Sequence, residues 1–491
     1  MIEDEELEQR VHRQLDQAKH AYRGNLAASA RLEEAAVRLA EPLRLAVAGP
    51  PRSGKSTLVN ALIGDDVAPA APTDGPVTFA SYQDGPEPRA WWFADDQRPH
   101  QVSMVRTTPG LSLSTGAASS PPGPDQTRRA IVEWPSRALR RTRIVDTLGG
   151  LAEGDDQTGA QRVFHEADAV LYLTGHLDES DLNFLWAGRG LRGPSVFPVH
   201  VIVVLSRADA TSGGRPDAMI TARQVARRRR REPRVGALCQ DVIAASPLIG
   251  HAARMLHEDE FRALAELARY QRTDLEPYLL SADRFTATDA IPGVPVENRD
   301  RLLRRLGLGG VRLAITLVRT GCTTRADLSE RLQEYSGLKE LQSAVAELFT
   351  ARRATLKARS TLTVLDHLLR TEPPPGQGDH LAEIELLMAE VHPFRELRLL
   401  SALRSGRVDL PAESAAEARR LLGGAGTSVG ERLNMPAEAT ADDIWSEAYA
   451  AADRWRHEPN RPGTTPAQRR AAEIVLRSCD MILTWLDETN L

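Results

Sequence analysis

A glycine-rich segment, GPPRSGKST (49–57), has the residue types and spacing of a phosphate-binding loop. It matches the pattern GxxxxGK[ST], with an apolar run before it and a helical pattern after it, as this motif requires. Backbone N–H groups and a helix N-terminus can surround the phosphates. Lys55 is placed to reach the β- and γ-phosphates, and Ser56 to coordinate Mg²⁺. We predict that a nucleotide contacts Gly49, Arg52, Ser53, Gly54, Lys55, Ser56 and Thr57.

A second motif, IVDTLGG (144–150), follows a later apolar run and fits the pattern DxxG. The Asp146 carboxylate at the end of the predicted strand can hold a water on Mg²⁺. The Gly149 amide can contact the γ-phosphate of a bound nucleotide. We therefore expect Ser56 and Asp146 to share one metal ion.

The segment PTDGPVT (72–78) lies between the first helix and the next strand pattern. It offers two threonines, Thr73 and Thr78, as the residue that closes over Mg²⁺ and the γ-phosphate. The carbonyl of that threonine would also align the attacking water. The residues alone leave both threonines open.

A third motif, VVLSRAD (203–209), indicates which base is bound. The Asp209 carboxylate can accept two hydrogen bonds from guanine, whereas adenine would leave it unpaired, and such a site can discriminate by about 10⁴. Ser206 and Arg207 stand where the usual motif has Asn or Thr followed by Lys, and the stem of Arg207 can still stack on a base. Ser246, after the last strand pattern, is a candidate for the loop at the base edge. An ATPase or kinase is the less favoured alternative, because Asp209 argues for guanine.

The chain carries a net charge of −5, which argues against a general nucleic-acid-binding protein. Its opening residues, MIEDEELEQR, are acidic where a signal peptide would be basic. No apolar run approaches the roughly 18 residues of a membrane-spanning helix. We therefore expect a cytoplasmic protein whose membrane contact is at most peripheral. The sparse cysteines fit a reducing compartment and indicate no zinc site: Cys239, Cys322 and Cys479.

Apolar runs that alternate with helical patterns predict the element order of the head. Five runs are typical of buried parallel strands: 43–49, 142–147, 167–175, 200–209 and 241–248. Two more, 77–82 and 88–93, predict a hairpin, and 107–128 predicts a loop. The alternation favours an α/β head, with a mostly parallel, doubly wound sheet, over 43–250.

Helical periodicity dominates the remaining chain. Residues 1–42 predict one N-terminal helix, whose thin apolar stripe must pack on a neck distant in sequence. Residues 251–491 predict an all-α helical-bundle neck and trunk. Its longest helix, about 337–371, would span about 50 Å before the linker 372–379. The trunk should therefore be elongated.

The order of these motifs resembles the dynamin superfamily and, more narrowly, the actinobacterial isoniazid-inducible dynamin-like GTPases. The segments that carry the resemblance include LAEPLRLAVAG, GKSTLVNALIGDDVAP, VEWP, IVDT, SRAD and GGAGTS. It covers nearly the whole chain and implies a P-loop GTPase head, a neck that includes the N-terminal helix, and a helical trunk. It also implies hydrolysis of GTP to GDP and phosphate, coupled to membrane remodelling at the inner face of the cell membrane. Family members often occur in pairs, so a second dynamin-like partner that holds the lipid is expected.

The resemblance also assigns roles to residues. It favours Thr78 over Thr73, since Thr78 matches the family's PxxxxPVT threonine. Arg52 stands where dynamins usually have serine and where the related guanylate-binding proteins carry an arginine finger that acts once two heads form a homodimer. The catalytic residues implied are therefore Arg52, Lys55, Thr78 and Gly149.

One departure from the family pattern leaves a second hypothesis open. Leu148 replaces the usual proline of the DxxG segment, which places the stiffness of this switch in doubt. The alternative to an active GTPase is therefore a GTP-gated scaffold with weak hydrolysis. Such a scaffold would be the regulatory half of a hetero-oligomer with a membrane-binding dynamin-like partner.

Overall fold

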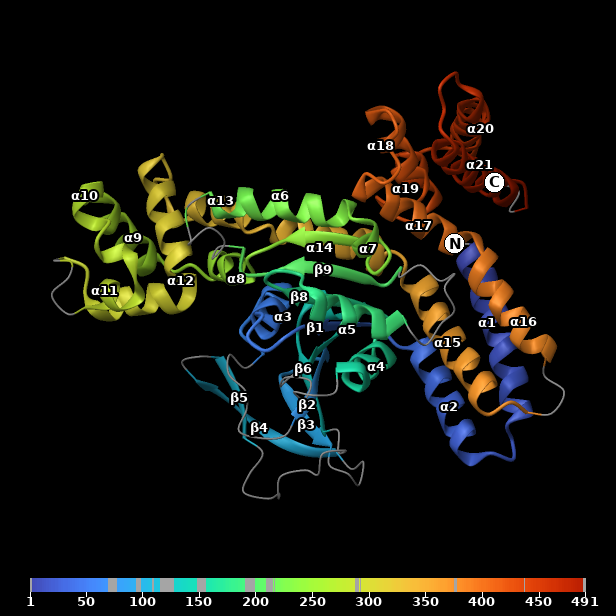
Figure 1. Ribbon diagram of the computed structural model, residues 1–491, viewed down its shortest axis with the longest axis horizontal. Helices are drawn as coiled ribbons and strands as arrows, with labels where there is room; N and C mark the ends of the chain where they lie inside the picture. The colour runs from blue at the N-terminus through green and yellow to red at the C-terminus, as the bar shows by residue number, and fades with distance from the viewer. Residues whose placement is uncertain are drawn as a thin grey trace.

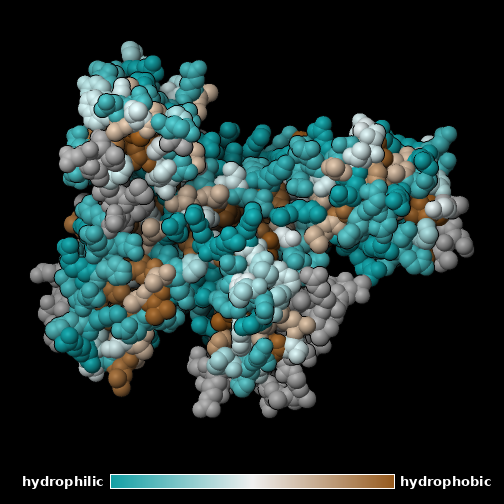
Figure 2. All heavy atoms as spheres, turned by 180° about the vertical axis from the view of Figure 1, so that it is seen from behind, coloured by the Kyte–Doolittle hydropathy of each residue, from teal (hydrophilic) through white to brown (hydrophobic). Residues whose placement is uncertain are grey.

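The computed structural model shows a central head flanked by a helical arm on one side and a helical neck on the other (Figure 1). The structure describes residues 2–68, 77–93, 99–107, 110–114, 128–147, 156–189, 199–208, 215, 217–287, 291, 293–374, 378–436 and 438–488. Hydrophilic residues cover most of the face in Figure 2, with hydrophobic residues scattered among them. In the described part of the chain, none of the helices combines the length and apolarity needed to cross a bilayer.

The described residues of the head form a ten-stranded sheet in the order β10-β9-β8-β1-β7-β2-β6-β3-β4-β5. Neighbouring strands from β10 to β7 pair in parallel. These strands are apolar along their length because both faces of the sheet are covered. Each strand lies within its predicted run, although β9 and β10 cover only the first half of theirs: β1 (Leu43–Ala48), β7 (Thr142–Thr147), β8 (Ala169–Thr174), β9 (Val201–Leu205) and β10 (Asp241–Ala244).

The other half of the sheet corrects the predicted hairpin. β2 (Val77–Asp84) and β3 (Arg89–Phe93) are not paired, because β6 (Arg128–Trp134) lies between them. β6 pairs in parallel with β2 and antiparallel with β3. The predicted loop 107–128 is also wrong in part, since β4 (Pro99–Thr107) is followed by β5 (Gly110–Ser114). The short polar connection between β2 and β3 is typical of a hairpin, but β6, which comes later in the sequence, lies between the two strands.

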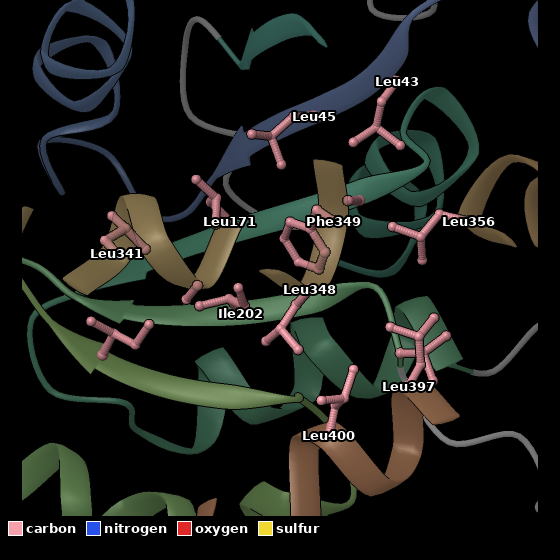
Figure 3. Close-up of a cluster of buried hydrophobic side chains, with 14 of the residues drawn as sticks. Leu43, Leu45, Leu171, Ile202, Leu341, Leu348, Phe349, Leu356, Leu397 and Leu400 are labelled. Carbon is pink, nitrogen blue, oxygen red and sulfur yellow. The ribbon is translucent and has the colours of Figure 1, made fainter. Parts of the chain in front are cut away.

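One face of the sheet is covered by a segment far downstream of it. α14 (Leu338–Val345) and the π-helical turn Ala346–Thr350 place Leu341, Leu348 and Phe349 against Leu171 and Ile202 of the sheet (Figure 3). All five side chains are buried. The head core therefore does not end near residue 250, because residues from the downstream half of the chain complete it.

The predicted 35-residue helix is interrupted. α14 and the π turn end before Arg352, whose backbone leaves the helical region at φ −106° and ψ 22°, and α15 (Arg353–Thr371) then begins. The guanidinium of Arg352 is buried and donates from Nη1 to Glu396 Oε2 at 2.8 Å. The first half therefore lies on the head, and only α15, about 28 Å long at 1.5 Å per residue, runs along the neck.

The predicted N-terminal helix is likewise two helices, α1 (Ile2–Ala21) and α2 (Leu26–Ala40). Asn25 separates them and caps α2, because its side chain accepts a hydrogen bond from the Ala28 N–H at 3.1 Å. Both helices pack against α15 and α16 (Gly378–Glu390) around one apolar cluster. Tyr22 also donates to the Glu372 carbonyl at 2.9 Å, so the N-terminal segment is tied to the end of α15.

Two further helical groups complete the chain. The arm has its own apolar cluster and is made largely of α8 (Pro247–Arg254), α9 (Glu258–Arg269), α12 (Val296–Arg319) and α13 (Arg325–Ser336). α8 ends at Arg254, and α9 begins at Glu258. The C-terminal group includes α17 (His392–Ser405), α18 (Ala412–Leu421), α19 (Val429–Leu433), α20 (Ala441–His457) and α21 (Pro466–Glu488).

Candidate nucleotide-binding site

The phosphate-loop segment joins β1 to α3 (Lys55–Ile63) in the centre of the sheet. Gly49 has φ +142°, and a Cβ there would lie 2.1 Å from the Leu173 carbonyl oxygen. Gly54 caps α3 in the left-handed region at φ +97°. At Gly49 only glycine fits both the positive φ and the close approach to Leu173, and at Gly54 glycine suits the left-handed backbone. The structure therefore explains both glycines of the motif.

Arg52 lies at the exposed part of this loop with φ +60°. A non-glycine residue in the left-handed region costs roughly 1–3 kcal/mol and persists only where the surroundings impose it. The loop therefore holds an arginine where a glycine would be easier to accommodate. Its exposed guanidinium can reach a ligand or a partner from this position.

Lys55 begins α3, and its side chain is buried. Its Nζ donates to the Gly49 carbonyl at 3.0 Å and to the Pro50 carbonyl at 3.1 Å. Burial lowers the pKa of Lys55, while the nearby Asp146 carboxylate raises it. The ammonium group is therefore folded back on its own loop, beside the position that phosphates would take.

Ser56 and Asp146, the two residues expected to share a metal ion, are in hydrogen-bond contact. Ser56 Oγ donates to Asp146 Oδ2 at 2.9 Å, because β7 lies next to β1 and pairs Asp146 with Val47. Asp146 is fully buried, and burial raises its pKa to about 6, although Ser56 and Lys55 act to lower it. The contact joins the phosphate loop to the DxxG segment.

The second carboxylate oxygen of Asp146 indicates what the site is built to hold. Asp146 Oδ1 is buried and has no hydrogen-bond partner among the described residues. A buried unpaired carboxylate oxygen is costly unless a cation or a water satisfies it. Mg²⁺ binds to proteins through one or two oxygen side chains while keeping its waters and contacting substrate phosphates. Ser56 and Asp146 therefore fit a Mg²⁺ ion.

Two further buried hydroxyl groups near the loop have no hydrogen-bond partner in the described part of the chain. They belong to Ser53, in the phosphate loop, and to Tyr82, on β2. Burial raises the pKa of Tyr82 well above its ordinary value, and the charge of Asp146 adds to this effect. Sequence reasoning included Ser53 but missed Tyr82, because no motif singles out a tyrosine within an apolar strand.

The predicted base-binding residues follow β9 and β10 at the same edge of the sheet as the phosphate loop. Ser206 is buried, its backbone N–H donates to the Thr174 carbonyl at 2.8 Å, and its hydroxyl is unpaired in the described residues. Arg207 is exposed and has φ +55°. Ser246 is fully buried and caps α8, since its Oγ accepts from the Ile249 N–H at 3.4 Å. Ligands of open α/β sheets bind at the carboxyl ends of such strands.

Several predicted site residues lie outside the described residues, so the structure places only part of the site. These are Thr73, Leu148, Gly149 and Asp209, together with the side chain of Thr78. Thr57 is described and half-buried in α3. What the structure does bring together is the phosphate loop and the carboxylate of Asp146.

Comparison with known proteins identifies the family. Over 474 residues the chain is 36% identical to the isoniazid-induced protein IniC of Mycobacterium tuberculosis, both from strain CDC 1551 / Oshkosh and from strain ATCC 25618 / H37Rv. The match covers 94% of this chain and 94% of each relative. The chain belongs to the isoniazid-induced, bacterial dynamin-like family. No protein-family profile matches the sequence.

The solved structures that match this chain are only weakly similar to it. Two of them come from work described as an oligomerised bacterial dynamin pair that provides a mechanism for the long-range sensing and tethering of membranes. Each is 12% identical to this chain, with TM-scores of 0.34 and 0.33. The matches cover 98% and 100% of this chain and 74% and 76% of the solved chains. Likeness at this level supports no argument about partners or assembly.

Proposed function

We propose that this chain binds GTP with Mg²⁺ in the head and hydrolyses it to GDP and phosphate. The observation that carries the proposal is the joined pair of motifs, in which Ser56 Oγ donates to the buried Asp146 beside Lys55. Membership of a dynamin-like family supports the same activity. Phosphoryl transfer needs positioning and charge stabilisation more than a protein nucleophile, so the absence of a general base from the proposed set is no objection.

The side chains of the loop would exchange their present partners for the nucleotide. Lys55 would leave the carbonyls of Gly49 and Pro50 and donate to the phosphates. Ser56 and Asp146, with Thr78, would hold Mg²⁺, which when bound neutralises charge on the β- and γ-phosphates. A direct test is calorimetric titration of GTP and GDP with Mg²⁺; no heat at millimolar nucleotide would refute the proposal.

Guanine selection is assigned to Asp209, with Ser206 and Arg207 beside it. A carboxylate accepts from the N1–H and the exocyclic amine of guanine, whereas an amide at this position would match xanthine. Asp209→Asn should therefore weaken GTP binding by tenfold or more and strengthen binding of xanthosine triphosphate. A variant that was merely misfolded would lose both ligands. Competition by ATP equal to that by GTP in the unmodified protein would favour an ATPase instead.

Arg52 is proposed to act as an arginine finger in its own site once two heads form a homodimer. An arginine in this role contributes 10³ to 10⁵ in rate in other GTPases. Arg52→Ala should leave GTP binding nearly intact and abolish the rise in turnover with protein concentration. Arg227→Ala, which removes an exposed arginine from α6 (Ala218–Arg231), is the matched control. Unchanged turnover in Arg52→Ala would refute the role of Arg52.

Turnover is further proposed to be coupled to membrane remodelling or maintenance, with peripheral binding at the inner face of the cell membrane and with a second dynamin-like protein as a partner. The test is GTP turnover against protein concentration, with and without vesicles that contain anionic lipid. A rising specific rate supports the active GTPase. Flat, near-zero turnover with retained GTP binding would instead support the GTP-gated scaffold, in which Leu148 weakens the switch.

A further inference from the structure

A cavity of about 500 Å³ lies between the head and the neck, away from the phosphate loop. Its head wall is formed by β2, β6, α4 (Asp156–Glu166) and α5 (Glu179–Arg189), and its neck wall by α2 and α15. Phe79 and Phe164 line it from the head, and Val364 and Leu368 line it from the neck. Cavities of this size accommodate small organic ligands.

Among the described residues, four arginines and one carboxylate line the same cavity. Arg31 and Arg38 come from α2, Arg129 from β6 and Arg162 from α4, while the carboxylate belongs to Glu166. Arg129 is paired with Glu166, and Arg31 with Glu372 at 3.3 Å. The positive charge of Arg38 is offset in part by the nearby carboxylates of Asp168, Glu166 and Glu34.

Two of these guanidinium groups have unused donors. Arg38 is 8% exposed and donates from Nη1 to the His165 carbonyl at 2.7 Å, yet its Nε and Nη2 have no hydrogen-bond partner in the described residues. Its nearest carboxylate oxygen, on Asp168, is 3.7 Å from Nη2. Arg162 also has no hydrogen-bond or ion-pair partner within the described part of the chain. Buried donors left unpaired cost free energy that an anionic ligand would recover.

Because the cavity lies between the head and the neck, a bound ligand can affect how the two are arranged. Phe79 is the residue after Thr78 on β2, and α4 is the next helix after the DTLGG segment, so the head wall is built from elements that contain or follow the two predicted switches. The other wall belongs to the neck. A ligand that contacts both walls stabilises one arrangement of the head relative to the neck.

We propose that this cavity is a binding site for an anionic amphiphile, a molecule with a carboxylate or phosphate head and an apolar body. The head group is bound by Arg38 and Arg162. The apolar body lies on Phe79, Phe164 and Leu368. This inference does not rest on GTP hydrolysis, since binding can be measured in the absence of nucleotide.

The test is calorimetric titration of the full chain with decyl phosphate and with decanoate, each below the concentration at which it forms micelles. Binding of either probe is expected, and a comparison of the two identifies the preferred head group. Arg162→Gln and Arg38→Gln should each weaken binding by about tenfold or more, as expected for the loss of a charged hydrogen bond. Arg162 is only half-buried, so Arg162→Gln should fold normally. Thr363→Trp, which fills the cavity from α15, should abolish binding.

Arg262→Gln is the matched control, because this arginine is 75% exposed on α9, in the arm on the other side of the head from the neck (Figure 1). Its affinity for both probes should equal that of the unmodified chain. The proposal is overturned if neither amphiphile binds at 1 mM or if Arg162→Gln binds within twofold of the unmodified chain. Equal binding of decanol would show an apolar cavity only. Equal binding of inorganic phosphate would show an anion site without the apolar part.

Discussion

The substitution Glu396→Gln tests whether one buried carboxylate holds the neck to the C-terminal helices. Glu396 is fully buried on α17. Its Oε1 accepts from Arg432 Nη1 at 2.9 Å and from Ser478 Oγ at 2.8 Å. Its Oε2 accepts from Arg352 Nη1 at 2.8 Å and from Arg432 Nη2 at 3.1 Å. The carboxylate therefore joins the break before α15 to α19 and α21.

Two independent arguments give the decrease in the free energy of unfolding expected for Glu396→Gln. Breaking a buried ion pair by removing one partner costs about 3–5 kcal/mol, because a charge remains buried and unpaired. Independently, burial acts to raise the pKa of Glu396, but Arg432 and Arg352 outweigh it and lower the pKa from 4.5 to about 2. That shift corresponds to about 3 kcal/mol at neutral pH. Since glutamine keeps the shape but supplies a donor where an acceptor is needed, we expect a loss of about 3–4 kcal/mol.

The assay is urea unfolding at pH 7, followed by far-ultraviolet circular dichroism and tryptophan fluorescence. Hydrogen exchange of α17, α19 and α21 locates the change if these helices unfold before the head. Glu447→Gln is the control, because Glu447 and its partner Arg454 are 36% and 47% exposed and such pairs contribute about 0.2–1 kcal/mol. A loss below 1 kcal/mol in Glu396→Gln, or one no larger than in the control, would refute the reasoning.

Three further predictions follow from the described contacts. Burial lowers the pKa of His392 from 6.5 to about 4, although Glu396 acts to raise it. The unfolded chain therefore binds a proton at a higher pH than the folded chain, and the free energy of unfolding should fall by about 3 kcal/mol as pH decreases from 6.5 to 4. A urea midpoint that is constant over this range would contradict this prediction. Gly49→Ala should displace the phosphate loop and weaken GTP binding more than tenfold, whereas Gly24→Ala, with nothing within 4 Å of its Cβ, should bind normally in the same titration. Ser56→Ala should weaken GTP binding tenfold or more with Mg²⁺ and little with EDTA; an equal loss in both conditions would exclude a metal-linked role.

The strands of the head were predictable because their signal is local. β7 has the predicted bounds, and β1 differs by one residue, since strands buried on both faces are continuously apolar. The residue pattern of the phosphate loop was equally predictable, because its residues lie within a few positions of one another directly after β1. The contact that excludes a Cβ at Gly49 comes from Leu173 on β8, which is distant in sequence.

Strand order and helix breaks were not predictable in the same way. β2 and β3 are close in sequence, yet the partner of each is β6, and apolar alternation says which face is buried but not which strand lies alongside. The helical periodicity across 337–371 continues through the π turn, so the break at Arg352 becomes visible only with the burial of its guanidinium against Glu396.

The sequence by itself determined the residue pattern of the phosphate loop and the parallel strands of the head, since both depend on residues within a few positions of one another. Tertiary structure decided that Ser56 contacts Asp146, 90 positions away, and that α14 closes the core of the head. It also decided that four arginines gather at the junction with the neck. These contacts depend on which surfaces are buried against each other, and local periodicity shows that a surface is apolar but not which other segment covers it.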